Sequence, residues 1–197
     1  MARRRPSLKR TANKQYGWAS AQDRTIVALN TITTTVLVAG DADIEVRAVG
    51  GTHANLKRII GDLVWHPWVL DTTVAFPATA IVSNIEFYWA IMAVDNDDNP
   101  AQYAPDNPVA LSEERILSHG VLPATAYRFP GGANNDTPSW IITGETRAHI
   151  DVRSNRRIRS DDDIVLNTIL RGNTPESGFF EESGFACIFR SLVKFPG

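Results

Sequence analysis

The stretch "NIEFYWAIMAV", residues 84–94, gives the clearest indication of fold class in this chain. Apolar residues alternate along it, and many are β-branched or aromatic, which is the period-two pattern of a β-strand. Large apolar side chains share one face: Ile85, Phe87, Trp89, Ile91 and Ala93. The other face becomes apolar toward its end, through Ala90, Met92 and Val94. The pattern predicts a strand that is buried on both sides.

The same strand signal recurs along the chain. Residues 184–197, "GFACIFRSLVKFPG", alternate in the same way and predict a long C-terminal strand that ends at Pro196. The segment 31–38, "TITTTVLV", is almost entirely β-branched, a composition that disfavours a helix. The remaining strand candidates are 25–29, 44–49, 56–65, 76–83, 139–143, 147–153 and 163–170.

The connectors between these strands are rich in Pro, Gly and Asn, which are turn-forming residues. The longest connector, residues 95–108, is expected to lie over the surface or over a neighbouring molecule. One segment is expected to be helical: "ALSEERILSH", residues 110–119, has acids near its start and His119 near its end, which suits the helix dipole. Eight or more strands with turns between them indicate an all-β sandwich or barrel with at most one or two short helices.

Charge is unevenly distributed along the sequence. Residues 1–22 hold six cations and no acid, although the whole chain has a net charge of −2. The cations are Arg3, Arg4, Arg5, Lys9, Arg10 and Lys14. Residues 23–197 therefore carry a net charge of −8. We expect residues 1–22 to form an extended or disordered basic arm and residues 23–197 to form one domain.

Three roles for the arm are open: a solubilising tail, an organelle-targeting peptide or a nucleic-acid-binding segment. The last is favoured, because each Lys or Arg that contacts a phosphate releases condensed counterions. Tyr16 and Trp18 are able to stack on exposed bases, or alternatively to pack where the arm joins the domain.

A second basic cluster lies in "RSNRRIRSDDD", residues 153–163. If residues 147–159 are extended, alternation places Arg153, Arg157 and Arg159 on one side and Arg156 on the other. The cluster is either a solvated edge paired with Asp161, Asp162 and Asp163, or an inner or inter-subunit surface that binds phosphate or carboxylate. Trp65 and Trp68 fit core filling and subunit contact equally well.

Motifs that carry chemistry are missing from the sequence. It holds no phosphate-binding loop, nucleophile elbow or HExxH motif. The histidines (His53, His66, His119 and His149) and the single cysteine Cys187 lack metal-ligand spacing. The "SDDD" run, residues 160–163, predicts a polar turn, because neighbouring residues on a strand point to opposite faces. We therefore expect no catalytic residue, cofactor or metal, and no membrane partner, since residues 25–40 are too polar to cross a bilayer.

The order of these features resembles the coat proteins of small icosahedral viruses, most of all the capsid proteins of small single-stranded DNA viruses. The resemblance is carried by the Arg-rich start "MARRRPSLKR" and by three later segments. These are "RIIGDLVW" (58–65), "EFYWAIMAV" (86–94) and "RSNRRIRSDDDIVLNTIL" (153–170).

The resemblance implies a single jelly-roll β-sandwich of eight strands in two sheets. It further implies many copies in an icosahedral shell, a genome of single-stranded nucleic acid held by the basic arm, and no small-molecule substrate. The protein would then be found in the virion after synthesis in the host cell, with entry into the nucleus left open. The alternatives are a cellular nucleic-acid-binding β-barrel module with a basic tail, a sandwich-type enzyme or lectin with its site in 95–138, and a phage or tail structural β-protein.

Overall fold

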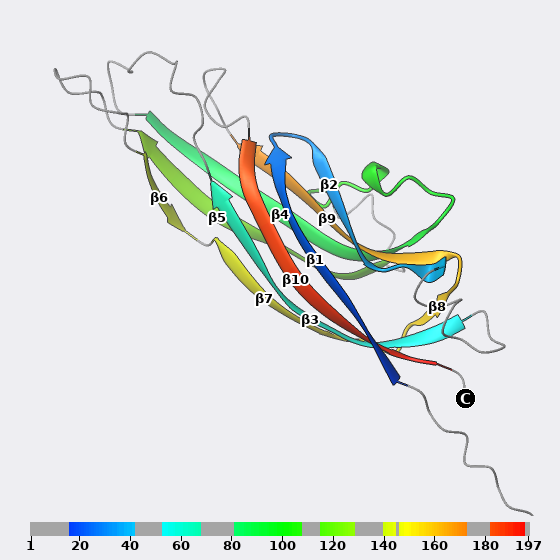
Figure 1. Ribbon diagram of the computed structural model, residues 1–197. Helices are drawn as coiled ribbons and strands as arrows, with labels where there is room; N and C mark the ends of the chain where they lie inside the picture. The colour runs from blue at the N-terminus through cyan, green and yellow to red at the C-terminus, as the bar shows by residue number, and fades with distance from the viewer. Residues whose placement is uncertain are drawn as a thin grey trace, which may run out of the picture.

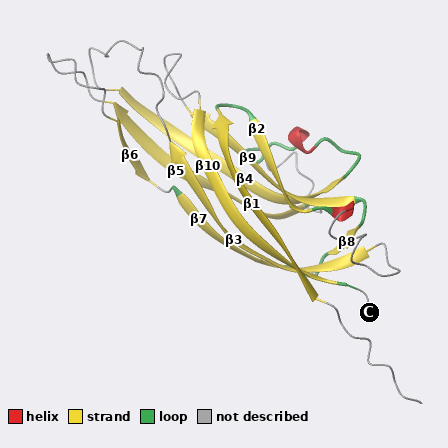
Figure 2. Cartoon of the chain, viewed as in Figure 1, coloured by secondary structure: helices red, strands yellow, loops and turns green. Residues whose placement is uncertain are grey.

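The computed structural model describes residues 16–41, 53–67, 81–107, 115–128, 140–144, 146–172 and 182–195. Strands make up almost all of this part of the chain, and they form two antiparallel sheets packed face to face (Figures 1 and 2). Sheet A contains β1 (Tyr16–Ala28), β10 (Glu182–Lys194), β3 (His53–Pro67) and β7 (Arg147–Arg153) in that order, with β8 (Arg157–Arg159) also paired to β3. Sheet B contains β2 (Ile32–Val38), β9 (Asp162–Gly172), β4 (Ile81–Asp95), β5 (Ile116–Arg128) and β6 (Trp140–Gly144) in that order.

The pairing of the eight main strands is that of a long hairpin rolled into a sandwich. Going outward from the middle of the chain, β4 pairs with β5, β3 with β7, β2 with β9 and β1 with β10. Rolling then brings β10 beside β3 and β9 beside β4. This is the jelly-roll topology, so the predicted fold class is confirmed. The short strands β6 and β8 are additions at the ends of this arrangement.

The helix predicted over residues 110–119 is wrong where the structure describes it. Residues 116–119 belong to β5, which pairs with β4 along most of its length. Long-range pairing overrides the local signals, because Leu122 and Ala124 then enter the core. The described part of the chain contains a short 3-10 helix, η2 (Pro100–Gln102), and no helix long and apolar enough to span a membrane.

Strand β1 begins at Tyr16, within the range 1–22 that we expected to be the arm. Residues 16–22 pair with β10 and are part of the sheet. Residues 1–15, and with them the rest of the expected arm, lie outside the described residues. So do the predicted strand 44–49, the first part of the predicted strand 76–83, and Trp68.

Stacked aromatic rings connect the two sheets. Phe87 of sheet B stacks on both Trp65 and Phe185, which lie directly opposite each other on sheet A, and the ring centroids are 5.8 Å apart in each of its two pairs. Trp65 has 0% of its surface exposed, so it fills the core and has no surface to offer a second subunit. The suggestion that Trp65 contacts another subunit is therefore wrong for the folded chain, because sheet packing covers its whole ring.

The connector 96–107 lies over the outer face of sheet B. It covers a small apolar cluster formed by Ala90, Met92, Val94 and Val165, against which Tyr103 and Ile116 also pack. Strand β4 is therefore buried on both faces over its second half, as predicted from residues 84–94. The prediction that this connector covers a surface is confirmed as well.

Asn167 fixes the connector to sheet B. Its side chain is fully buried on β9, and its Nδ2 donates to the carbonyl oxygens of Pro100 at 2.7 Å and Tyr103 at 2.9 Å. Its Oδ1 accepts from the Thr34 hydroxyl at 2.7 Å. Replacing Asn167 with leucine removes three hydrogen bonds, although the carbonyl oxygen of Pro100 still accepts from the backbone N–H of Tyr103 at 3.1 Å.

We expect Asn167→Leu to lower the free energy of unfolding by about 2–3 kcal/mol, since each of the three lost hydrogen bonds contributes about 0.5–1.5 kcal/mol and the leucine recovers part of this. Urea unfolding followed by tryptophan fluorescence measures the loss. Asn99→Ala, which removes only the exposed cap of η2, is the matched control and should cost less than about 1 kcal/mol. Equal stability of both variants would show that Asn167 does not fix the connector.

Candidate nucleic-acid interface

The outer face of sheet A is rich in positive charge. Side chains that point away from sheet B alternate along each strand with the buried ones, and we call the surface that they form the basic face. Its cations are Arg24, Arg58, Arg147, Arg153, Arg157, Arg159, Arg190 and Lys194. Among the side chains described on this face, the acids are Asp62 and Asp151. A chain with a net charge of −2 thus presents a strongly positive surface on one sheet.

Strand register places these residues in rows across the sheet. One row runs across four strands, in the order Tyr16 of β1, Lys194 of β10, Asn55 of β3 and Arg157 of β8. In the next row, Trp18 is followed by Leu192, Arg58 and Arg153. Directly opposed residues in a sheet are about 5 Å apart at Cβ, so adjacent side chains within a row are close enough to interact. The cations are therefore most concentrated at the end of the sheet where β1 begins.

Both acids of the basic face are already paired. Arg58 Nε and Nη2 donate to the two carboxylate oxygens of Asp151 at 2.7 Å each. Arg147 Nη2 donates to Asp62 Oδ1 at 3.2 Å, and His149 Nδ1 lies 3.2 Å from the same oxygen. The hydrogen bond from Arg58 holds the pKa of Asp151 below its usual range. The hydrogen bond with His149, together with that from Arg147, lowers the pKa of Asp62.

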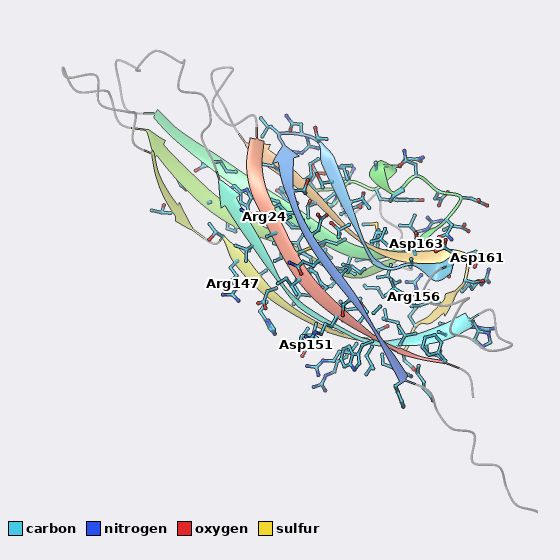
Figure 3. All side chains as sticks on the ribbon, in the orientation of Figure 1. Arg24, Arg147, Asp151, Arg156, Asp161 and Asp163 are labelled. Carbon is cyan, nitrogen blue, oxygen red and sulfur yellow. The ribbon has the colours of Figure 1, made fainter. Side chains whose placement is uncertain are left out.

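The other cations of the basic face make no ion pair with any residue that the structure describes. They are Arg24, Arg153, Arg157, Arg159, Arg190 and Lys194. In Figure 3, Arg24 lies on β1, whereas Arg147 and the paired Asp151 lie on β7. Counted over the described side chains, this surface therefore carries a surplus of positive charge.

Three of the four arginines in the predicted cluster lie on the basic face. Arg153, Arg157 and Arg159 are exposed there, at the end of β7 and on β8. The predicted alternation through residues 147–159 is interrupted, because residues 154–156 leave the strand between β7 and β8. Arg156 lies in this break, half-buried, and its carbonyl oxygen accepts from the backbone N–H of Leu56 at 2.8 Å. Figure 3 shows Arg156 at the same end of the molecule as Asp161 and Asp163.

The "SDDD" run forms a polar turn at Ser160 and Asp161, as predicted, and continues into the first two residues of β9, Asp162 and Asp163. The backbone N–H of Arg159 donates to Asp162 Oδ2 at 3.1 Å, and that of Gly40 donates to Asp163 Oδ1 at 2.8 Å. Gly40 is packed so closely that an added Cβ would lie 2.5 Å from the carbonyl oxygen of Ser160. The described residues hold no group of three His, Cys, Asp or Glu side chains placed to bind a metal ion.

Cys187 lies in the core beneath the basic face and is 1% exposed. Burial raises the pKa of its thiol to about 11. The thiol therefore stays protonated at neutral pH, and a buried protonated thiol is neither a nucleophile nor a metal ligand.

The outer face of sheet B has a different charge pattern. The two arginines whose side chains are described there are paired: Arg115 with Asp98 at 2.7 Å, and Arg171 with Asp106 at 2.6 Å. Further exposed acids, Glu86, Asp95 and Asp97, lie on β4 and the connector that follows it. Among the side chains that the structure describes, the two outer faces of the sandwich thus differ in sign.

Comparisons with known proteins gave matches among solved structures. A chain of turnip yellow mosaic virus is 12% identical, with a TM-score of 0.33 and coverage of 100% of this chain and 86% of that chain. A chain of Desmodium yellow mottle tymovirus is 9% identical, with a TM-score of 0.31 and coverage of 100% and 91%. The tailspike protein of Acinetobacter baumannii phage AM24 is 6% identical, with a TM-score of 0.24 and coverage of 89% and 26%.

No family model and no curated protein matches the sequence. Because the TM-scores are low, we base the proposed function on this chain's own topology and charge distribution.

Sequence reasoning missed five cations of the basic face: Arg24, Arg58, Arg147, Arg190 and Lys194. They come from four strands, and only the register of sheet A brings them together. A signal was present in β10, where Arg190 and Lys194 alternate with buried Phe189, Ser191 and Val193. That alternation assigns the two cations to the solvent side of the strand, although not to a shared surface.

Proposed function

We propose that this protein is the coat protein of a small icosahedral virus. Copies of the jelly roll assemble into a closed shell, and the single-stranded genome is packaged inside by the basic arm together with the basic face of sheet A. The basic face points to the interior, and the acidic outer face of sheet B points away from the genome. The protein is thus a component of the virion that is made in the host cell, and an Arg-rich arm is also suited to carry it into the nucleus.

One observation carries this proposal: the arm joins the sheet where the basic face is most positive. Lys14 and Gln15 directly precede Tyr16, whose row contains Lys194 and Arg157. The arm, with its six cations, is therefore joined to the folded domain beside the domain's own cluster of cations. A polyanion that binds the arm meets the basic face without crossing an acidic surface.

The basic face also changes the charge available for packaging. The arm alone supplies +6 per chain, which is about 360 positive charges in a shell of about 60 copies. Eight cations and two acids on the basic face roughly double that number. The number of phosphates neutralised depends on the number of cations that contact them. The basic face therefore neutralises part of the phosphate charge that a short arm alone would leave uncompensated.

Deleting residues 2–14 should leave shells intact and sharply reduce the nucleic acid that they contain. The deletion removes every cation of the arm and ends before β1, so the sandwich is kept whole. The ratio of absorbance at 260 nm to that at 280 nm, measured on purified shells, follows the nucleic acid content. The affinity of the shortened chain for nucleic acid should also fall less steeply with salt concentration than that of wild type, because fewer phosphate contacts remain. Unchanged content would show that the arm is not a packaging element.

The basic face also favours a second candidate function, a cellular nucleic-acid-binding module with a basic tail. Such a module requires a positive binding surface on the folded domain, and the outer face of sheet A is one. The two functions differ in assembly: a coat protein forms closed shells, whereas a binding module coats a nucleic acid as separate subunits.

A further inference from the structure

Two aromatic side chains are exposed at the start of β1. Tyr16 is 56% exposed and Trp18 is 49% exposed, and both point to the outer side of sheet A. The residues of β1 that point inward here are small, Gly17 and Ala19. Leaving large rings half in water forfeits the apolar burial that favours them in a core, so a surface aromatic pair of this kind is typical of a binding site.

Cations surround this pair. Lys194 lies directly opposite Tyr16 on β10, and Arg58 and Arg153 continue the row of Trp18 beyond Leu192. Arg157 completes the row of Tyr16. These two rows contain no acid, and the acid that pairs with Arg58 lies in the adjoining row, at Asp151. Exposed rings among cations are the arrangement by which proteins hold single-stranded nucleic acid, with bases on the rings and phosphates on the cations.

The spacing of the rings determines which form of nucleic acid fits. Residues two apart on a strand are separated by about 7 Å along it. Successive bases of a duplex are stacked about 3.4 Å apart, so they cannot occupy both rings without unstacking. A single strand separates its bases at much lower cost.

We propose that Tyr16 and Trp18 form a base-stacking platform that makes this protein selective for single-stranded over duplex nucleic acid. The platform binds two neighbouring bases without regard to sequence, while Lys194, Arg153 and Arg157 contact the flanking phosphates. This inference rests on the proposed single-stranded partner and adds the residues and the contact by which the protein distinguishes it from a duplex. It also gives the first residues of β1, which directly follow the arm, a role that does not depend on their charge.

The test compares the full-length protein with the double variant Tyr16→Ala/Trp18→Ala in binding to three probes. These are labelled oligothymidylate, an abasic oligonucleotide of the same length, and a duplex of the same length, all at one salt concentration. Wild type should bind oligothymidylate more tightly than the abasic strand, and the double variant should lose about a hundredfold in affinity for oligothymidylate, about tenfold for each ring. Affinity for the abasic strand and the duplex should stay unchanged.

Two controls keep the outcome interpretable. Ile188→Ala removes an equally exposed apolar side chain of the same face, 58% exposed beside Gln22 and Asp62, and should not change any affinity. Tyr16→Phe/Trp18→Phe keeps a ring at both positions and should retain most of the preference for oligothymidylate.

Equal losses for all three probes would overturn the platform and leave the charge-based proposal standing. Unchanged affinities together with a loss of shells would overturn it too, since the rings would then be a contact between copies of the chain.

Discussion

Replacing Arg153, Arg157 and Lys194 with glutamine should weaken binding of single-stranded nucleic acid about a hundredfold at about 0.1 M salt. Each phosphate contact contributes about 0.7 to the slope of log K against log salt concentration for a single strand, so losing three lowers the slope by about 2. The three side chains lie on one end of the basic face, and none is in an ion pair with a residue that the structure describes. Their removal therefore should not disturb the sandwich. Fluorescence titration at several salt concentrations gives the slope.

A matched control separates local contacts from net charge. The variant Thr31→Asp/Asn84→Asp/Thr143→Asp shifts the net charge by the same amount at exposed positions on the strands and turns of sheet B. We expect it to keep a wild-type slope, because none of these positions lies on the basic face. Equal slopes for the two triple variants would mean that overall charge, and not the face of sheet A, attracts the nucleic acid.

Phe87→Ala should lower the free energy of unfolding by about 3–5 kcal/mol, the usual cost of removing a fully buried aromatic ring. Phe87 is 0% exposed and lies in the stack that joins sheet B to Trp65 and Phe185 of sheet A. Removing it leaves a cavity between the sheets and deprives both of the other rings of a partner. Urea unfolding followed by circular dichroism, at equal concentration and assembly state, measures the loss.

The control for this variant is Val121→Ala on β5, where the side chain is 41% exposed and points away from the core. Its cost should lie within about 0.5 kcal/mol of zero, as for most surface substitutions. A loss below about 1 kcal/mol for Phe87→Ala would contradict the view that this stack holds the two sheets together.

The parts of the fold that were predictable are those in which a strand's own sequence shows where it is buried. Residues 84–94 and 184–195 alternate so strongly that their inner faces are correct residue by residue, from Ile85 to Ala93 and from Phe185 to Phe195. Strand β1 was harder to find before Thr25, because its inward side chains there are small or polar: Gly17, Ala19, Ala21 and Asp23. Pairing with β10 forms this half of the strand, and no local pattern records that pairing.

The candidate site was predictable only in pieces. Arg153, Arg157 and Arg159 lie close together in the sequence, which therefore predicts that they form a cluster. Arg24, Arg58 and Lys194 join them through strand register, which depends on partners far away along the chain. The net charge of residues 23–197 did not reveal this surface. A domain with a net charge of −8 can still have one positive sheet when its acids lie elsewhere.

Electron microscopy of the purified full-length protein, combined with nuclease treatment and extraction of the protected nucleic acid, examines the proposed function as a whole. We expect uniform closed shells that contain nuclease-resistant, single-stranded nucleic acid. Monodisperse single subunits at high concentration, both with and without added single-stranded nucleic acid, would contradict the proposal that this sandwich is a coat protein.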